Sequence, residues 1–168
     1  VEPPIQDLSM DHIAAEAGIS RGLLFHYFPT KTDFYLACIA AAGRRMLRNT
    51  GPDPDAPGEE QVATTVRLMV QQIARRRDFY LALVHGHGVA DTRVSEGVDS
   101  VRTGNTTRVV SALGLAEAQR DVVRAWWAYV EERALTWSAP PPARRRPGID
   151  ALVAECVAAL SALLEISA

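Results

Sequence analysis

A run of donor and aromatic side chains between Ser20 and Lys31 is the part of the sequence best equipped to bind another molecule. The guanidinium of Arg21 has the forked geometry that matches the O6 and N7 acceptors of guanine. Other donors in the run suit phosphate oxygens, helped by the positive end of a helix: Ser20, His26, Tyr27 and Lys31. Residues of these types in one short stretch indicate contact with double-stranded DNA.

Two short helices joined by a glycine turn are expected to position these side chains. Ser9 is a good N-cap, because its hydroxyl can accept an N–H of the first helical turn. An apolar stripe at helical spacing follows it: Met10, Ile13, Ala14 and Ala17. Gly18 suits a left-handed helix end, Ser20 caps a second helix, and Pro29 stops it. This is the helix-turn-helix pattern, whose second helix enters the major groove.

The outward faces of the second helix are unusual for a solvated helix. Leu24 and Phe28 are expected to point to the core, with Ile19 at the entry. The outer positions hold one arginine, one glycine and apolar or aromatic residues: Arg21, Gly22, Leu23, Phe25, His26 and Tyr27. Gly22 inside a helix costs about 1 kcal/mol relative to alanine, which close approach of a DNA backbone would explain. The alternative is an ordinary helical hairpin with aromatic packing.

The stretch SMDHIAAEAGISRGLLFHYFPTKTDFYLA resembles the DNA-binding signature of TetR-family transcriptional regulators. The usual form of that signature is near T-x-x-x-I-A-x-x-A-G-V-S-x-G-x-L-Y-x-Y-F-x-x-K-x-x-L, and Phe25 stands where the family often has tyrosine. The resemblance implies that Ser9 touches a phosphate and that eight further residues face DNA: Ser20, Arg21, Gly22, Leu23, Phe25, His26, Tyr27 and Lys31. Outside this stretch the chain resembles the family only in helical layout and length.

The segment before the signature departs from the family. TetR-family proteins place a long amphipathic helix there, whereas only VEPPIQDL precedes it in this chain, and two prolines make that a poor helix. We therefore expect the first helix to be missing from the chain as given, or not ordered. Its absence would leave Ile13, Leu24 and Phe28 partly uncovered.

The composition is that of an ordinary folded protein. The chain has 168 residues, of which 48% are hydrophobic and 23% charged, and this balance indicates neither disorder nor a membrane span. No apolar run reaches the roughly 18 residues of a spanning helix, and no secretory leader is visible at this N-terminus. Cys38 and Cys156 lie in apolar helical patterns, as reduced thiols do, so we expect a cytoplasmic protein without membrane contact.

The charge balance excludes a generally basic, electrostatic nucleic-acid binder. The net charge is −2, and in residues 1–50 the acidic and basic side chains are equal in number. The basic ones are Arg21, Lys31, Arg44, Arg45 and Arg48, and the acidic ones are Glu2, Asp7, Asp11, Glu16 and Asp33. Affinity for phosphates must therefore come from a few donors placed close to the DNA and from two copies of the binding site. This points to a homodimer.

The remaining pattern predicts an all-α fold. A capping box at Thr30–Asp33 starts a long helix that runs to about Arg48, and the loop TGPDPDAPG follows it. Further helices are expected over 59–77, 79–88, 91–113, 116–137 and 149–166. We divide the chain into a helix-turn-helix DNA-binding domain with its linker helix at 1–48, and a larger helical effector-binding and dimerisation domain at 49–168.

The last two predicted helices have wider apolar faces than one core requires. Small residues between the large ones permit close helix approach, so we expect a four-helix seam between two subunits, as the family resemblance also implies. The seam would contain Val123, Val130, Leu152, Cys156, Leu160 and Leu163. The alternative is that both faces pack inside one subunit.

Bulky residues of the middle helices are the candidates for an effector pocket, although aromatic residues at helical spacing are often plain core. They are Met69, Phe79, Tyr80, Leu83, His87, Trp126, Trp127, Tyr129 and Trp137. The pair His85 and His87 lacks the further ligands that a metal site needs, so no metal is expected. No nucleophile elbow, phosphate-binding glycine loop or cysteine–histidine motif is present, so we expect no catalytic residues, no cofactor and no enzyme activity.

Together with the family resemblance, these patterns predict a sequence-specific transcriptional repressor. Its partners would be a palindromic double-stranded DNA operator, a small apolar or amphipathic effector and a second copy of the chain. Without effector, the two recognition helices would lie about 34 Å apart, one DNA turn, and effector binding would favour a state with the wrong spacing. The alternative is a helical dimeric module that binds a small molecule and no longer uses its helix-turn-helix on DNA.

Overall fold

The structure is a computed structural model that describes residues 9–85 and 92–167, with the backbone alone at 82–85, 92–95, 97 and 98. The described residues form helices and turns without any strand, so the predicted all-α class is confirmed. The helices are α1 (Met10–Glu16), α2 (Arg21–Tyr27), α3 (Lys31–Asn49), α4 (Gly58–Arg75), α5 (Arg77–His85), α6 (Thr92–Leu113), α7 (Arg120–Ser138) and α8 (Ile149–Ile166). Short 3₁₀ turns lie at Glu117–Gln119 and Pro142–Arg144.

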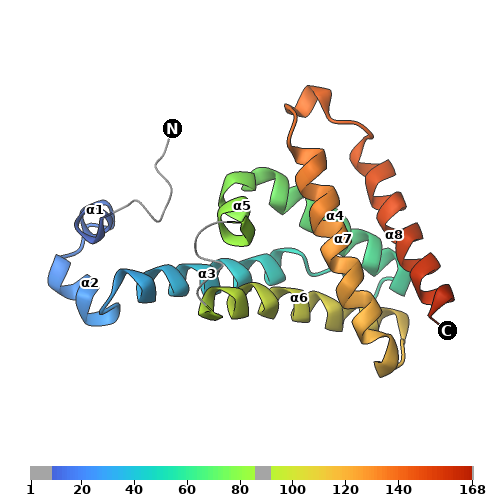
Figure 1. Cartoon of the computed structure of the whole chain (residues 1–168), viewed down its shortest axis with the longest axis horizontal. Helices are drawn as coiled ribbons and strands as arrows, with labels where there is room; N and C mark the ends of the chain where they lie inside the picture. Colours follow the sequence, from blue (N-terminus) through green and yellow to red (C-terminus); the bar gives the residue numbers. More distant parts are fainter. Residues whose placement is uncertain (1–8, 86–91, 168) are drawn as a thin grey trace.

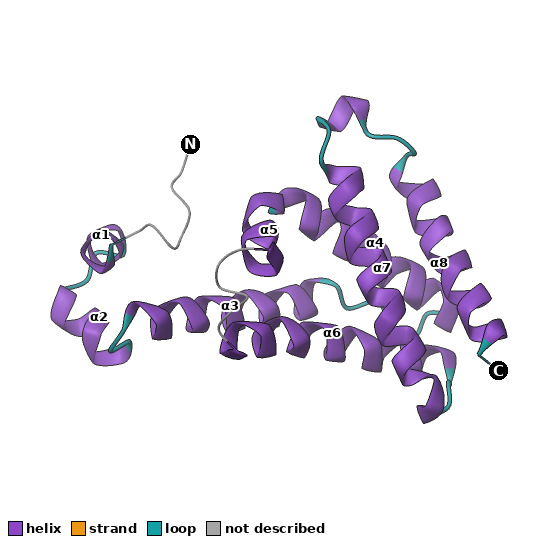
Figure 2. Ribbon diagram, in the orientation of Figure 1, coloured by secondary structure: helices purple, strands orange, loops and turns teal. Residues whose placement is uncertain are grey.

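Helix α3 connects a small N-terminal unit to a larger helical body (Figure 1). The short helices α1 and α2 lie at one end of α3, and the rest of α3 runs alongside α6. In the body, α4, α7 and α8 pack on one another, and α7 also packs on α6. Figure 2 shows how the helices are joined by short loops, the longest described one leading from α7 to α8.

The N-terminal helices begin and end where the sequence predicts. The hydroxyls of Ser9 and Ser20 accept from His12 N and Leu23 N, each at 3.1 Å, and cap α1 and α2. Gly18 takes the left-handed conformation with φ 66°, which allows the tight turn between them. The predicted capping box is present at the start of α3, where Thr30 and Asp33 exchange hydrogen bonds.

Two hydrophobic cores of unequal size lie at the two ends of α3. The small one consists of Met10, Ala14 and Leu24, with Phe28 and Phe34 packed against it in an edge-to-face pair. The large core fills the body, and its fully buried side chains come from α4, α6, α7 and α8: Val62, Val66, Met69, Val70, Ile73, Val109, Val123, Trp126, Trp127, Leu152 and Leu160.

Helix α3 contributes to both cores, because Phe34 packs against the small core and Met46 against the large one. It therefore belongs to both units, and a boundary at residue 48 stays a prediction.

The predicted dimer residues lie mostly inside the single chain. Five of them are at most 2% exposed, because α7 and α8 use these faces to pack on each other and on α4: Val123, Val130, Leu152, Cys156 and Leu160. Only Leu163, at 38% exposed, has surface to offer a second copy. This corrects the expectation, because the width of an apolar helix face does not distinguish an interface between two subunits from the core of one subunit.

Candidate functional site

The recognition helix α2 exposes apolar and aromatic side chains that the fold does not need for its core. Leu23 is 44% exposed and Tyr27 68% exposed, and the ring of His26 lies edge-on to that of Tyr27 with centroids 5.3 Å apart. Ser9, Ser20 and Lys31 are also exposed. The predicted DNA-facing residues are thus available at the surface along α2 and at the helix starts beside it, with the exception of Phe25.

Phe25 differs from its predicted place on the outer face. It is half-buried and packs against the core of Met10, Ala14 and Leu24, because this small unit has few large side chains to fill its interior. Ile19, expected in the core, is 36% exposed and lies at the edge of the unit.

Arg21, the predicted base-reading residue, is held by two neighbours. Its Nη1 donates to a carboxylate oxygen of Asp11 at 2.9 Å, and its guanidinium lies 5.1 Å from the centre of the Phe25 ring. Asp11 is on α1, so the two residues link the two helices of the motif. Both side chains are exposed, and an exposed ion pair of this kind contributes little to stability. Arg21 can therefore leave Asp11 for a stronger acceptor.

Gly22 faces open space, so a substitution at this position can test whether helix α2 closely approaches the DNA. A Cβ built at Gly22 meets no atom within 4 Å, and the residue lies inside α2 with ordinary helical backbone. We predict that Gly22→Ala stabilises the fold by up to about 1 kcal/mol while it weakens operator binding, because the new methyl group separates α2 from the DNA. Thermal unfolding and DNA titration of the variant would measure the two effects. Unchanged operator affinity would contradict the predicted close approach.

Two glycines bring α3 and α6 unusually close together. A Cβ at Gly43 of α3 would lie 2.9 Å from Cγ2 of Val101, and a Cβ at Gly104 of α6 would lie 2.8 Å from Cδ2 of Leu47. Real Cβ atoms do not approach other atoms this closely, so a side chain at either position would force Val101 or Leu47 to shift. Helix α3 therefore packs closely on α6 at these two points, with a side chain of one helix against a glycine of the other.

Arg108 of α6 fastens the C-terminal end of α3. Its Nη2 donates to the Leu47 carbonyl oxygen, and its Nη1 donates to Thr50 Oγ1 at 3.1 Å and to Asn105 Oδ1 at 3.4 Å. A cation is favourable here because the last carbonyls of a helix carry partial negative charge. Burial lowers the pKa of the Arg108 guanidinium. Arg108 thus joins α3 directly to the interior of α6.

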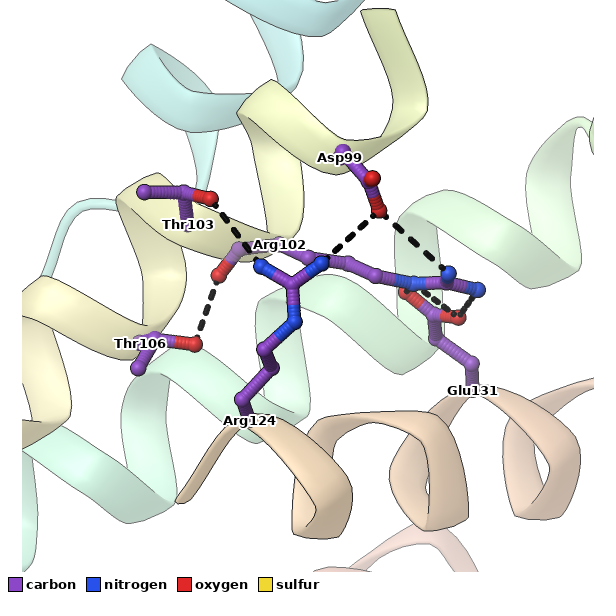
Figure 3. A network of polar contacts seen from close by, with 6 residues as sticks. All are labelled: Asp99, Arg102, Thr103, Thr106, Arg124 and Glu131. Carbon is purple, nitrogen blue, oxygen red and sulfur yellow. Dashed lines mark hydrogen bonds and ion pairs between the residues drawn. The ribbon is translucent and has the colours of Figure 1, made fainter. Parts of the chain in front are cut away.

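A buried ion pair joins α6 to α7 (Figure 3). Nε of Arg102 donates to both carboxylate oxygens of Glu131 at 3.1 and 3.0 Å, and Nη2 donates to one of them at 2.6 Å. The Glu131 side chain is only 6% exposed. Asp99 lies 3.8 Å from Arg102 and also accepts from Arg124 at 3.2 Å, which extends the network to the surface.

Tyr80 of α5 completes this network from a third helix. Its phenol is buried, and burial, the charge of Glu131 and a side-chain hydrogen bond to Glu131 all raise the pKa of Tyr80. Glu131 therefore interacts with Tyr80 of α5 as well as with Arg102 of α6. The three helices that would enclose an effector are held together at this point by charge and hydrogen bonds.

The predicted effector residues separate into two groups. Met69, Tyr80, Trp126 and Trp127 are buried in the large core, and Phe79 is half-buried beside it. Leu83 lies in α5, but its side chain is outside the described residues, as is the whole of His87.

The other group lies on the α8 side of α7. The phenol of Tyr129 donates to Glu155 at 2.7 Å, beside Arg133, and these two partners lower the pKa of Glu155 to about 2. Nε1 of Trp137 donates to the Pro147 carbonyl at 2.7 Å, and Arg145 covers its ring. Ten residues of helix, about 15 Å, separate Trp137 from Trp127. We therefore remove Tyr129 and Trp137 from the effector-facing set.

Two donors in the core of the body have no hydrogen-bond partner within the part of the chain that the structure describes. They are Nδ2 of Asn105 on α6 and Nε1 of Trp127 on α7, and both residues are 1% exposed. An unpaired buried donor costs about 1–3 kcal/mol. Native proteins seldom leave such groups unused.

Several residues of this site escape the sequence prediction. Glu131 occupies an apolar stripe, with Trp127 one turn before it and Leu135 one turn after it, and a carboxylate in that position is a sign of a buried partner. Nothing in the sequence identifies Arg102 as that partner, because the two are 29 residues apart. Asn105 and Arg108 resemble ordinary polar positions of a long helix.

Neither a metal site nor a membrane segment is found in the described ranges. No group of three or more His, Cys, Asp or Glu side chains there could hold a metal ion. Of the helices that the structure describes, none combines the length and apolar character needed to cross a membrane.

Comparison with known proteins identifies the N-terminal unit and the fold. Residues 2–38 match the family model of bacterial regulatory proteins of the tetR family. The crystal structure of a tetR-family transcriptional regulator from Streptomyces coelicolor is similar with a TM-score of 0.80 and 28% sequence identity, over 97% of this chain and 73% of that one. No curated protein matches the chain.

Two further solved structures share the fold at lower identity. A TetR-like transcriptional regulator from Rhodococcus sp. RHA1 has a TM-score of 0.67 at 21% identity, over 96% of this chain and 86% of that one. The transcriptional regulator FadR from Bacillus subtilis, solved in complex with stearoyl-CoA, has a TM-score of 0.62 at 15% identity, over 93% and 88%.

These similarities agree with the capped helix-turn-helix and the helical body described above. They support a DNA-binding regulator of transcription, as the sequence predicts. Residues 2–38 thus match the tetR family of bacterial regulatory proteins, and the chain shares the fold of a tetR-family transcriptional regulator.

Proposed function

We propose that this protein is a repressor that a small-molecule effector releases from its DNA operator. The observation that carries the proposal is the direct connection of α3 to α6. Gly43 and Gly104 bring the two helices into close contact, and Arg108 of α6 donates to the Leu47 carbonyl of α3 and to the Thr50 hydroxyl just after it. Because α6 also forms a wall of the body, an effector that shifts α6 acts on the helix that carries the DNA-reading unit.

On the DNA side, α2 is the element that enters the major groove. We assign base reading to Arg21 and close backbone approach to Gly22. Phosphate and sugar contacts come from the exposed residues around them: Ser9, Ser20, Leu23, His26, Tyr27 and Lys31. Phe25 supports α2 from within, since it packs on the small core.

On the effector side, the proposal places the ligand among α4, α5, α6 and α7. The residues that remain from the predicted set are Met69, Phe79, Tyr80 and Trp127. Their character suits a small apolar or amphipathic molecule with a few polar groups. FadR, which shares the fold, was solved with stearoyl-CoA bound, and this supports a body able to enclose a partly apolar ligand.

We further propose that two copies associate through the outer faces of α7 and α8. Small exposed residues line both faces at helical spacing and permit close helix contact. They are Ala125 and Ala128 on α7, and Ala151, Ala154, Ala158 and Ala162 on α8. Leu163 and Ile166, at 38% and 83% exposed, supply apolar surface next to the small residues.

Ala158→Glu is predicted to split this dimer without unfolding the subunit. Ala158 is exposed at the middle of the proposed seam, so a carboxylate there would be buried and doubled only on association. Sedimentation velocity should show a monomer with an unchanged helical circular dichroism spectrum. Ala118→Glu, the same change at an exposed 3₁₀ turn, is the control and should remain dimeric. A dimeric Ala158→Glu variant would put the interface elsewhere.

Fluorescence anisotropy of the full chain on the DNA upstream of its own gene tests the proposed function directly. Saturable binding that resists competitor DNA, at two salt concentrations, is the expected result, followed by release when an effector is added. The footprint should show half-sites about 34 Å apart. Absence of binding at low salt would reject the repressor and favour the ligand-binding module.

A further inference from the structure

The three tryptophans of the body differ in how their indole N–H groups are used. Nε1 of Trp126 donates to the Cys156 carbonyl, and Nε1 of Trp137 donates to the Pro147 carbonyl, each at 2.7 Å. Nε1 of Trp127 has no acceptor among the described residues although the side chain is 1% exposed. The difference leaves the indole N–H of Trp127 open to an acceptor from outside the described residues.

Asn105 has a second buried donor without a described partner, and the orientation of its side-chain amide follows from its neighbour Arg108. Arg108 carries donors only, so the atom of the Asn105 amide that faces it must be the oxygen, and Nη1 of Arg108 indeed donates to Oδ1 at 3.4 Å. The amide nitrogen, Nδ2, is thereby turned away from Arg108 and left without a partner in the described part of the chain.

The register of α6 against α7 brings these two donors to the same level of the body. The hydrogen bonds Arg102–Glu131, Arg124–Thr103 and Arg120–Thr107 show that the two helices run in opposite directions. One turn beyond Arg102 on α6 lie Asn105 and Thr106, and one turn before Glu131 on α7 lies Trp127. Figure 3 shows Arg102 and Thr106 on α6 and Glu131 on α7, with Thr106 donating to the Arg102 carbonyl.

The charges around the two donors are already matched. Arg102 and Arg124 face the carboxylates of Glu131 and Asp99, two against two. Arg108 is directed at the carbonyl end of α3, where the helix dipole balances its charge. Each of these three arginines already has an anionic or carbonyl partner, so an uncharged oxygen, which needs only the two N–H donors, suits the described site better than an additional negative charge.

We propose that Asn105 and Trp127 bind an uncharged oxygen acceptor of the effector, such as the carbonyl of a ketone, ester or amide. The assignment rests on the proposed function, since it names the chemistry of the same effector site. Fully buried apolar side chains of the same core as Trp127 would hold the hydrocarbon part: Val66, Met69, Val109 and Val123.

The same amide connects the ligand to the DNA-reading unit. Nδ2 of Asn105 would hold the effector oxygen while Oδ1 of Asn105 accepts from Arg108, which holds the end of α3. A ligand that turns the Asn105 amide therefore changes the hydrogen bonds of Arg108. The acceptor oxygen of the effector would therefore act on α3 through Asn105 and Arg108.

Matched pairs of probes that differ only in the oxygen test the assignment on the free protein, without DNA. Acetophenone and ethylbenzene form one pair, and 2-heptanone and heptane form a second. In ¹⁵N-tryptophan-labelled protein, the ketones should shift the indole N–H resonance of Trp127 and bind about 10-fold more tightly than the hydrocarbons. Trp127→Phe keeps an aromatic ring without the donor and should abolish the preference.

Trp137→Phe is the matched control, because it removes an indole N–H whose acceptor lies in the loop before α8. It should retain the full preference for ketones. Equal binding of ketone and hydrocarbon, absence of ketone binding at millimolar concentration, or a preference that survives Trp127→Phe would each overturn the assignment. A Trp127 indole that responds only to exchange with water would mean that the donors hold an ordered water.

The outcome can be separated from that of the proposed function. A ketone preference without any effect on DNA binding would leave the acceptor site standing and reject effector-controlled release. Release of DNA by other compounds, with no ketone preference, would reject the acceptor site and leave the repressor standing.

Discussion

Arg102→Met is expected to lower the free energy of unfolding of the body by about 3–5 kcal/mol, the loss typical of a buried carboxylate deprived of its cation. The side chain of Glu131 is only 6% exposed in the intact protein, and Tyr80 would be the partner that the described residues still offer it. Methionine fills similar volume, so the lost ion pair and not a cavity dominates the effect. Urea unfolding at fixed protein concentration measures it.

The reverse change should be milder, and this asymmetry is the sharper part of the prediction. Glu131→Leu leaves Arg102 with Asp99 nearby and with 26% of its side chain exposed, so the guanidinium keeps an anionic neighbour and water. The double variant Arg102→Met/Glu131→Leu should recover much of the stability lost in Arg102→Met. Additive losses in the double variant would contradict the account.

Arg21→Ala is expected to remove about 1–3 kcal/mol of discrimination for each recognition helix, if Arg21 reads a guanine. Both subunits of the proposed dimer carry the change, so operator affinity should fall by about 30-fold to 10⁴-fold. The fold should be unaffected, because the Arg21–Asp11 pair is exposed on both sides. Titrations of operator and scrambled DNA would measure the loss and show whether it depends on sequence.

Two neighbouring variants separate base reading from general attraction. Lys31→Ala should weaken binding to all sequences alike and reduce the salt dependence, as loss of a phosphate contact does. Asp11→Asn frees Arg21 and removes a negative charge near DNA, so binding to scrambled DNA should increase. If Arg21→Ala lowers affinity for both DNAs equally, Arg21 is a phosphate ligand and not a reader of bases.

The N-terminal unit could be predicted in detail because local chemistry determines it. Ser9, Gly18, Ser20 and Thr30 act through atoms a few residues away, and their caps and turns appear in the structure as expected. Phe25 could not be placed by the same reasoning. Whether an aromatic ring on α2 turns outward or inward depends on how much interior the small unit must fill, which is a property of the assembled helices.

For the larger helical body, only the outline could be predicted from the sequence. The apolar stripes give the helices and most of the core, including Trp126 and Trp127. The pairing of Arg102 with Glu131 and the connection of Arg108 to α3 depend on the register between helices far apart in sequence. For the same reason the apolar faces of α7 and α8 could be assigned to a seam between subunits, although Leu152 and Leu160 are buried inside one chain.

The glycine contact on α3 also has a mechanical meaning. Gly43 is held against α6, and the twelve residue steps from there back to Lys31 form a rigid arm, about 18 Å long at 1.5 Å per residue. A tilt of about 10° at its anchored end moves the tip by about 3 Å. In the proposed dimer two such arms would open the gap between the recognition helices by about 6 Å, a large error against a 34 Å groove repeat. The length of α3 therefore amplifies a small rotation of α6 into a spacing of the recognition helices that no longer matches the DNA grooves.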